Sequence, residues 1–66
     1  MKVRINGKEQ DISGLENLCE LIEERDLSGK AVVIEHNYNI IPKDKWRETI
    51  LDESDNIEIV SFVGGG

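Results

Sequence analysis

The sequence predicts a single α+β domain in which one sheet of four to five strands packs on one helix. Three observations support this prediction: an alternating N-terminal segment that ends in Asn6-Gly7, one amphipathic helical stripe after it, and two β-branched runs nearer the C-terminus. A helix after a hairpin must cover the apolar face of that hairpin, and the remaining strands must extend the same sheet. With 66 residues, the chain has room for one thin core and little room for a walled active site.

The first twelve residues predict a β-hairpin. Residues 1–5 alternate apolar and charged side chains, and Asn6-Gly7 readily takes the two positive φ angles of a type I′ turn. Residues 8–12 carry a single apolar side chain, so we expect a charged edge strand that discourages further pairing.

A helix is predicted to start at Ser13, because Ser13 and Glu16 have the S-x-x-E spacing of a capping box. It is predicted to end near Arg25, since Ser28-Gly29 signals a turn. Acidic side chains cover one side of this segment, and the other side carries an apolar stripe formed by Leu15, Leu18, Cys19, Leu21 and Ile22. The stripe predicts that the helix packs on the sheet.

The middle of the chain predicts a core strand followed by short elements. The β-branched residues 31–35 are typical of a central strand that is buried on both faces. A turn at 37–39 precedes a very short strand at 40–41, which Pro42 stops because it lacks an amide hydrogen. Residues 43–48 predict one helical turn, whose single tryptophan, Trp46, we expect to plug the open edge of the core.

The C-terminal part predicts a solvated acidic loop at 52–56 and then a last strand. Along that strand, alternation places Ile57 and Ile59 on one face, and Val60 and Phe62 on the other. Val60 and Phe62 could dock a partner and aim the terminus, although packing of Phe62 on its own domain is equally compatible with the sequence.

After this strand the chain reads Val63-Gly64-Gly65-Gly66. We therefore expect a domain at residues 1–63 and a flexible glycine tail at 64–66, thin enough to enter a narrow slot. A carboxylate at the tip of such a tail is a poor electrophile and needs activation, typically with ATP and Mg²⁺. The sequence has no phosphate-binding G-x-x-x-x-G-K-[ST] loop, so we expect this chain to bind no cofactor and the activating site to belong to a partner.

Composition excludes several classes of function. The chain has 8 Lys and Arg against 14 Asp and Glu, a net charge of -6 that opposes nucleic-acid binding. This acidity suits steering toward a basic patch on a protein partner, although plain solubility explains it equally well. No signal peptide or run of transmembrane length is visible, so we expect a cytoplasmic protein without a membrane partner.

Cys19 and His36 are the other residues with reactive or metal-binding potential. As the only cysteine, Cys19 excludes an internal disulfide and a thiolate metal site. Its place on the apolar stripe favours a core residue over a persulfide carrier. His36 has no second histidine or cysteine near it, so we expect a strand-end residue and no metal site.

The chain resembles the ThiS family, the sulfur carriers of thiamin thiazole biosynthesis, over its whole length. The likeness comes from the Asn6-Gly7 hairpin, the Ile41-Pro42 step followed by Trp46, and the closing segment Ile57-Glu58-Ile59-Val60-Ser61-Phe62-Val63-Gly64-Gly65. It implies a ubiquitin-like β-grasp fold with a mixed sheet, and a protein cosubstrate that is not itself an enzyme.

The resemblance also implies a chemistry for the tail. In this family an E1-like adenylyltransferase of the ThiF type adenylates the terminal glycine, and sulfur from a donor such as cysteine desulfurase converts it to a thiocarboxylate. A thiazole synthase of the ThiG type then takes the sulfur. Gly66 would carry the sulfur here, with Gly64 and Gly65 threading it into the partner. The family needs only a Gly-Gly end, so Gly65 would be the working residue if Gly66 were an addition to the natural chain.

Two alternatives remain at this stage. The small subunit of molybdopterin synthase shares the fold and the terminal glycines, although the short length and residues 42–46 favour the thiamin branch. A ubiquitin-like modifier or a simple interaction domain would differ in ending as an isopeptide bond or in acting only through its apolar surface.

Overall fold

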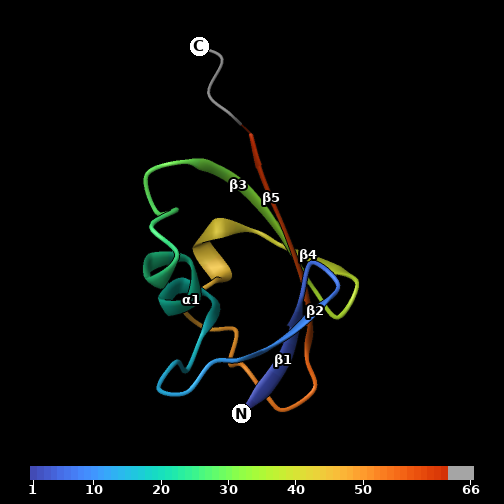
Figure 1. Ribbon diagram of the computed structural model, residues 1–66. Helices are drawn as coiled ribbons and strands as arrows, with labels where there is room; N and C mark the ends of the chain where they lie inside the picture. Colours follow the sequence, from blue (N-terminus) through green and yellow to red (C-terminus); the bar gives the residue numbers. More distant parts are fainter. Residues whose placement is uncertain (63–66) are drawn as a thin grey trace.

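The computed structural model describes residues 1–62 of the chain (Figure 1). The predicted tail at 64–66, and the last residue of the predicted domain, lie outside this range, so both stay predictions. The described elements are β1 (Lys2–Ile5), β2 (Lys8–Asp11), α1 (Leu18–Glu24), β3 (Ala31–His36), β4 (Asn39–Ile41), the 3₁₀ turn η1 (Lys43–Lys45) and β5 (Asn56–Phe62).

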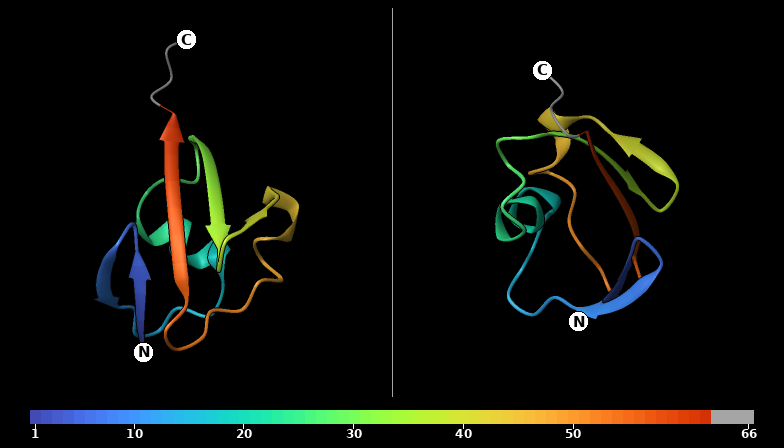
Figure 2. Two further views of the ribbon diagram at one scale, coloured as in Figure 1. Left: turned by 90° about the vertical axis from the view of Figure 1, so that its right-hand side faces the viewer. Right: turned by 45° about the horizontal axis from the view of Figure 1, so that its top comes forward.

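The strands form one mixed sheet in the order β2-β1-β5-β3-β4. The neighbours β1 and β5 run parallel, and all other neighbouring strands run antiparallel. Both α1 and η1 lie on one face of the sheet, and no element among residues 1–62 covers the other face (Figures 1 and 2). The predicted α+β architecture of one sheet packed on one helix is confirmed.

The N-terminal hairpin has the turn that its sequence predicts. Asn6 and Gly7 have φ angles of 51° and 83°, the pair of positive values that a type I′ turn requires. β2 lies at the edge of the sheet and contains no buried side chain. The prediction of a charged edge strand is also confirmed.

The side chain of Asn6 extends the pairing between β1 and β5 past the end of β1. The Asn6 backbone N–H donates to the carbonyl of Ile57 at 2.9 Å. Its side chain then pairs with Ile59, donating from Nδ2 to the carbonyl at 3.2 Å and accepting from the N–H at 2.7 Å. Beyond Ile59, β5 continues to Phe62 with β3 as its one neighbour among the described residues.

The predicted start of the helix at Ser13 is wrong, because α1 begins at Leu18 with Asn17 as its N-cap. The Asn17 side chain accepts from the N–H of Glu20 at 2.8 Å, and the Glu20 side chain accepts from the N–H of Glu16 at 2.7 Å. The reciprocal cap therefore forms four residues later than expected.

The delay has a structural cause in the residues before the helix. Gly14 has a φ of 85°, which is incompatible with a helix. Backbone hydrogen bonds from Leu18 to Thr49 (3.1 Å) and from Leu51 to Glu16 (2.9 Å) hold the chain extended there. The predicted end near Arg25, in contrast, is confirmed, since Arg25 is the C-cap.

Residues 31–35 do form an inner strand of the sheet, as predicted, but the prediction that this strand is buried on both faces is wrong. β3 lies inside the sheet between β5 and β4, but β5 is the central strand. Ile34 is fully buried under α1, whereas the neighbouring Val33 is 37% exposed on the uncovered face. A sheet covered on one face can bury only alternate residues of a strand.

The core lies between the sheet and α1, with η1 closing one side. Trp46 is 5% exposed, and its Nε1 donates to the carbonyl of Ile41 at 2.9 Å, so the predicted plug at the core edge is confirmed. The buried apolar side chains come from all parts of the described chain: Val3, Ile5, Ile12, Leu18, Leu21, Ile22, Ile34, Trp46, Leu51 and Ile57. Within residues 1–62, α1 and η1 are too short to span a lipid bilayer.

Candidate functional site

The C-terminal end of β5 carries exposed apolar side chains on the uncovered face of the sheet. Val60 is 52% exposed and Phe62 is 55% exposed. Both face away from α1, as the alternation of the last strand predicted. The alternative in which Phe62 packs into its own domain does not hold, because more than half of this side chain is open to solvent.

Strand register adds two residues of β3 to this surface. Val33 lies directly opposite Val60, and Ala31 lies directly opposite Phe62. All four side chains are exposed. We call this surface the outer patch, and it comprises Ala31, Val33, Val60 and Phe62. Its position on the face that no helix covers can be followed on the two central strands of Figure 2, left.

The outer patch lies beside the predicted glycine tail in the sequence. Only Val63 separates Phe62 from Gly64. The predicted sulfur-carrying residue Gly66 and the threading residues Gly64 and Gly65 lie outside the described residues, so their roles stay predictions. A partner that binds the tail must approach the end of β5, where the described chain ends in the outer patch.

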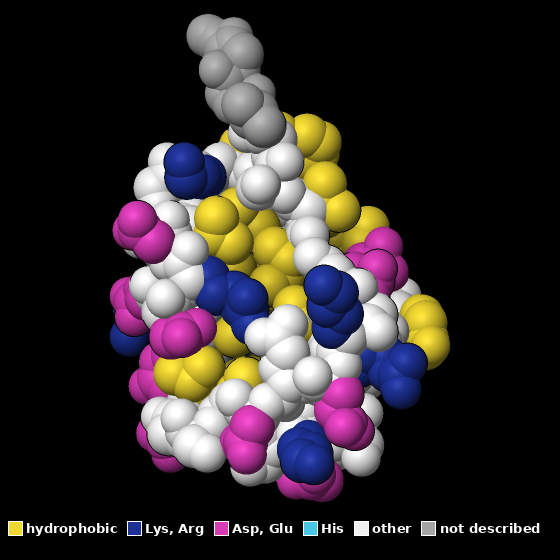
Figure 3. Space-filling view, in the orientation of Figure 1, with side chains coloured by type: hydrophobic (Ala, Val, Ile, Leu, Met, Phe, Trp, Pro, Cys, Tyr) yellow, Lys and Arg dark blue, Asp and Glu magenta, His cyan; other side chains and the backbone are white. Residues whose placement is uncertain are grey.

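On the opposite side of the sheet, a groove of about 500 Å³ lies between α1 and the segment around η1. Figure 3 views the molecule from the sheet edge that carries β2, where hydrophobic atoms gather near the centre with Lys and Arg side chains beside them. The groove is lined by Cys19, Ile22 and Glu23 on one wall and by Lys43, Trp46 and Arg47 on the other.

Cys19 packs against the core, as its place on the apolar stripe predicted, but it is only partly buried. Its Sγ lies 4.0 Å from an Oε2 atom of Glu23. Among residues 1–62, no group of three or more His, Cys, Asp or Glu side chains could hold a metal ion.

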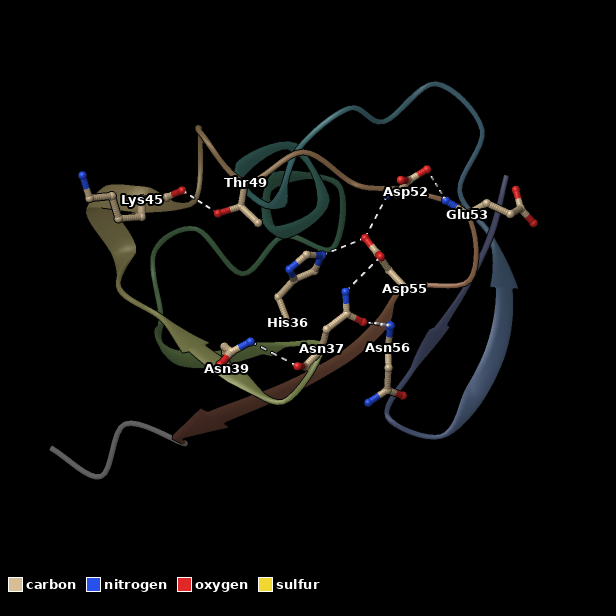
Figure 4. A network of polar contacts seen from close by, with 9 residues as sticks. All are labelled: His36, Asn37, Asn39, Lys45, Thr49, Asp52, Glu53, Asp55 and Asn56. Atoms are coloured by element: carbon tan, nitrogen blue, oxygen red, sulfur yellow. Dashed lines mark hydrogen bonds and ion pairs between the residues drawn. The ribbon is translucent and has the colours of Figure 1, made fainter.

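His36 and the acidic loop form a polar network that the sequence did not predict (Figure 4). The prediction of a solvated loop at 52–56 is wrong for Asp55, which is 7% exposed. Asp55 lies 2.7 Å from His36 Nε2, accepts from Asn37 Nδ2 at 3.1 Å and accepts from the Asp52 N–H at 2.8 Å. His36 does lie at the end of β3, as predicted.

This network holds the β3–β4 turn against the start of β5. Burial alone would raise the pKa of the Asp55 carboxyl, but hydrogen bonds from His36, Asn37 and Asp52, together with the attraction of His36, outweigh it and lower the pKa. The carboxylate is therefore ionised and fully occupied by its neighbours. It acts as a structural clamp at the end of the sheet opposite the outer patch.

Sequence reasoning found two residues of the outer patch and missed the other two. The sequence predicts burial of Val33 on a strand covered on both faces. A β-branched run shows the same hydrophobic pattern whether one face of the sheet or both faces are covered. The alternate residues Ala31 and Val33 can be placed beside Val60 and Phe62 only from the register in which β3 pairs with β5, and the sequence alone does not give that register.

Comparison with known proteins agrees with this architecture. The profile of the ThiS family matches residues 3–66. The chain is 37% identical to the sulfur carrier protein ThiS of Bacillus subtilis, with 97% of this chain and 98% of that protein covered. It superposes on the crystal structure of the thiamine biosynthesis protein ThiS from Geobacter metallireducens with a TM-score of 0.82 and 28% identity over both full lengths.

A thiazole synthase of Paramagnetospirillum magneticum is also similar, with 35% identity over 66 residues. The chain spans only 20% of the length of that protein. The structural match confirms the ubiquitin-like β-grasp fold of ThiS proteins. Because the family profile spans nearly the whole chain, and a sulfur carrier of similar length is 37% identical to it, the chain belongs to the ThiS family of sulfur carrier proteins in thiamin biosynthesis.

Proposed function

We propose that this chain carries sulfur as a thiocarboxylate on Gly66 and donates it to thiazole formation in thiamin biosynthesis. It acts as a protein cosubstrate, and partner enzymes supply the catalysis. The observation that carries the proposal is the outer patch, an exposed apolar surface that ends one residue before the glycine tail on a domain of the ThiS family.

The chemistry starts from an unreactive group. The Gly66 carboxylate is anionic and stabilised by resonance, so a nucleophile does not displace its oxygen. An E1-like adenylyltransferase of the ThiF type, using ATP and Mg²⁺, joins the carboxylate to AMP and releases pyrophosphate. AMP is then a good leaving group. The terminal sulfur of a persulfide on a donor such as cysteine desulfurase attacks the acyl carbon and displaces AMP, and a thiol reductant then cleaves the resulting S–S bond, which leaves the thiocarboxylate and returns the donor cysteine as a thiol.

Each part of the C-terminal region has a distinct role in this proposal. Gly64 and Gly65 lack Cβ atoms and can pass through a slot that excludes larger residues. Val60 and Phe62 bind an apolar surface of the partner, which excludes water and orients the tail. The rigid pairing of β5 with β3 holds these two side chains in place.

Thiazole synthase of the ThiG type is the proposed acceptor of the sulfur. Support comes from the thiazole synthase of Paramagnetospirillum magneticum, which contains a segment 35% identical to this whole chain. A protein that contains both a carrier-like segment and the rest of a thiazole synthase brings the two functions together. We propose the same association between separate chains here, in the cytoplasm.

Intact-mass spectrometry tests the proposal directly. The chain is incubated with the adenylyltransferase, ATP, Mg²⁺, a thiol reductant, and cysteine desulfurase with cysteine. We expect a mass gain equal to the replacement of one oxygen by sulfur, and fragmentation should place it on Gly66. A chain whose terminus stays unmodified, beside a second carrier that the same enzymes do modify, would contradict the proposal.

A variant that lacks Gly66 decides which glycine is used. Its terminus falls short by one residue, about 3.5 Å of extended chain, so we expect slower thiocarboxylate formation. Faster formation on Gly65 in this variant would assign the role to Gly65 instead.

A further inference from the structure

Two glutamates face each other on the uncovered side of the sheet, next to the outer patch. Glu35 of β3 lies directly opposite Glu58 of β5, and the next pair on the same face is Val33 and Val60. Both carboxylate side chains are half-buried. The face therefore carries an acidic pair at one end and apolar side chains from there to the end of β5.

This arrangement costs the fold stability. Like charges directly opposite each other on neighbouring strands repel and destabilise a sheet. Within residues 1–62, neither Glu35 nor Glu58 takes part in an ion pair or a side-chain hydrogen bond. The strands would pair better with a neutral residue at either position.

The acidic pair also lies in line with the end of β5. Glu58, Val60 and Phe62 are alternate residues of one strand and point to the same face. At about 3.3 Å per residue, Glu58 lies roughly 13 Å behind Phe62 along the strand. A protein that contacts both ends of this row is held in a defined position relative to the end of β5.

We propose that Glu35 and Glu58 together bind an arginine or lysine side chain of the adenylating enzyme. One cation between the two carboxylates removes their repulsion, and a guanidinium can donate to both of them at once. The partner surface is therefore apolar opposite the outer patch and basic opposite the acidic pair. This inference rests on the proposed function, since it names how the activating partner recognises the carrier.

The net charge of -6 on this chain fits a positively charged surface on the partner. An acidic carrier is attracted over long range by a basic surface, and the acidic pair converts that attraction into one docking position. The acidic pair sharpens the orientation that the outer patch gives, because apolar contact by itself is non-directional.

The test replaces both carboxylates with amides of the same shape, in the full chain, as the double variant Glu35→Gln and Glu58→Gln. The matched control is Glu16→Gln with Glu24→Gln, which removes the same charge from two exposed positions on the helix side. Affinity for the adenylating enzyme is measured by titration at low and at high salt, separately from thiocarboxylate formation.

We expect the double variant to bind about tenfold more weakly at low salt, with a smaller difference at high salt. The control should bind nearly as well as the unmodified chain. The melting temperature of the double variant should equal or exceed that of the unmodified chain, because the repulsion is gone. If the double variant binds more weakly but is as stable as the unmodified chain, the loss of affinity arises at the interface and not from unfolding.

Equal affinity of the double variant and the control would overturn the proposal that the acidic pair binds a cationic side chain of the partner. An unmodified chain that binds the enzyme but never gains sulfur would overturn the proposed function instead. In that case the difference in affinity between the two variants still decides whether Glu35 and Glu58 bind the partner.

Discussion

Asp55 follows the exposed residues 52–54, yet its own side chain is buried. Its three contacts come from two different parts of the chain, the β3–β4 turn and the loop that precedes β5. Asn37 reinforces the same connection, since its Oδ1 accepts from the N–H of Asn56 at 2.8 Å. The buried negative charge of Asp55 is therefore tolerated, because the groups of His36, Asn37 and Asp52 that contact its carboxylate all donate hydrogen bonds to it.

Replacing Asp55 with asparagine should destabilise the domain by about 2 kcal/mol, since a buried hydrogen bond to a charged group contributes about that much. The amide cannot accept from all the donors that meet the carboxylate. Urea unfolding at neutral pH measures the loss. Asp44→Asn, on an exposed side chain of η1, is the control and should change stability by less than about 0.5 kcal/mol.

Acid sensitivity should follow from the same carboxylate. The pKa of Asp55 is lower in the folded protein than its ordinary value of 3.8, so the unfolded chain binds a proton more readily. Its contribution is fully present above about pH 5 and is lost as the pH falls through the folded pKa, below about 4. Urea midpoints measured from pH 6 to pH 2 should fall less steeply in Asp55→Asn than in the unmodified chain. Parallel curves would contradict this assignment.

At the scale of elements, α1 depends on its cap and its packing. It has only seven residues, Leu18–Glu24, and a helix of this length is not stable in water by itself. Leu18, Leu21 and Ile22 bury its apolar face against the sheet. The reciprocal bonds of Asn17 and Glu20 satisfy its first amides.

Two substitutions distinguish the observed helix start from the one that the sequence suggests. Asn17→Ala should cost about 1 kcal/mol, because it removes the side chain that caps the helix. Ser13→Ala should cost clearly less, since Ser13 bonds only to the exposed side chain of Asp11. Urea unfolding of both variants checks the order, and a larger loss from Ser13→Ala would place the start of the helix where the capping-box pattern put it.

At the scale of the whole molecule, the domain has one closed face and one open face. The helix and η1 cover the closed face, and the outer patch lies on the open face. A substitution on the open face can therefore alter partner binding without disturbing the core.

Val60→Asp should lower the rate of adenylation at least tenfold, because a charge is placed in an apolar contact with the partner. Stability should change little, since Val60 is 52% exposed. The control is Ile50→Asp, a side chain that is 63% exposed and lies outside the outer patch. The measurement is kcat/KM with the carrier as the varied substrate, together with thermal melting. Equal rates for both folded variants would remove Val60 from the docking surface.

The sequence predicted the individual secondary-structure elements better than it predicted which elements contact one another. The hairpin turn, the edge strand and the role of Trp46 each follow from local chemistry that needs no distant neighbour. The helix start failed because the pairing of residues 16–18 with 49–51 overrode a local capping pattern. The burial of Asp55 and the facing of Glu35 and Glu58 depend on strand register. The register brings together residues about twenty positions apart, and the local sequence contains no pattern that predicts it.

The way in which Asn6 ends the β1–β5 pairing narrows the sheet toward the end of β5. Ile57 is fully buried and anchors the strand, whereas Val60 and Phe62 contribute little to the core. Beyond Ile59, β3 is the one neighbour of β5 among residues 1–62, so the sheet tapers from five strands to two. A two-stranded end fits a narrower recess in a partner than the full sheet does, and the Asn6–Ile59 pair marks where the sheet widens.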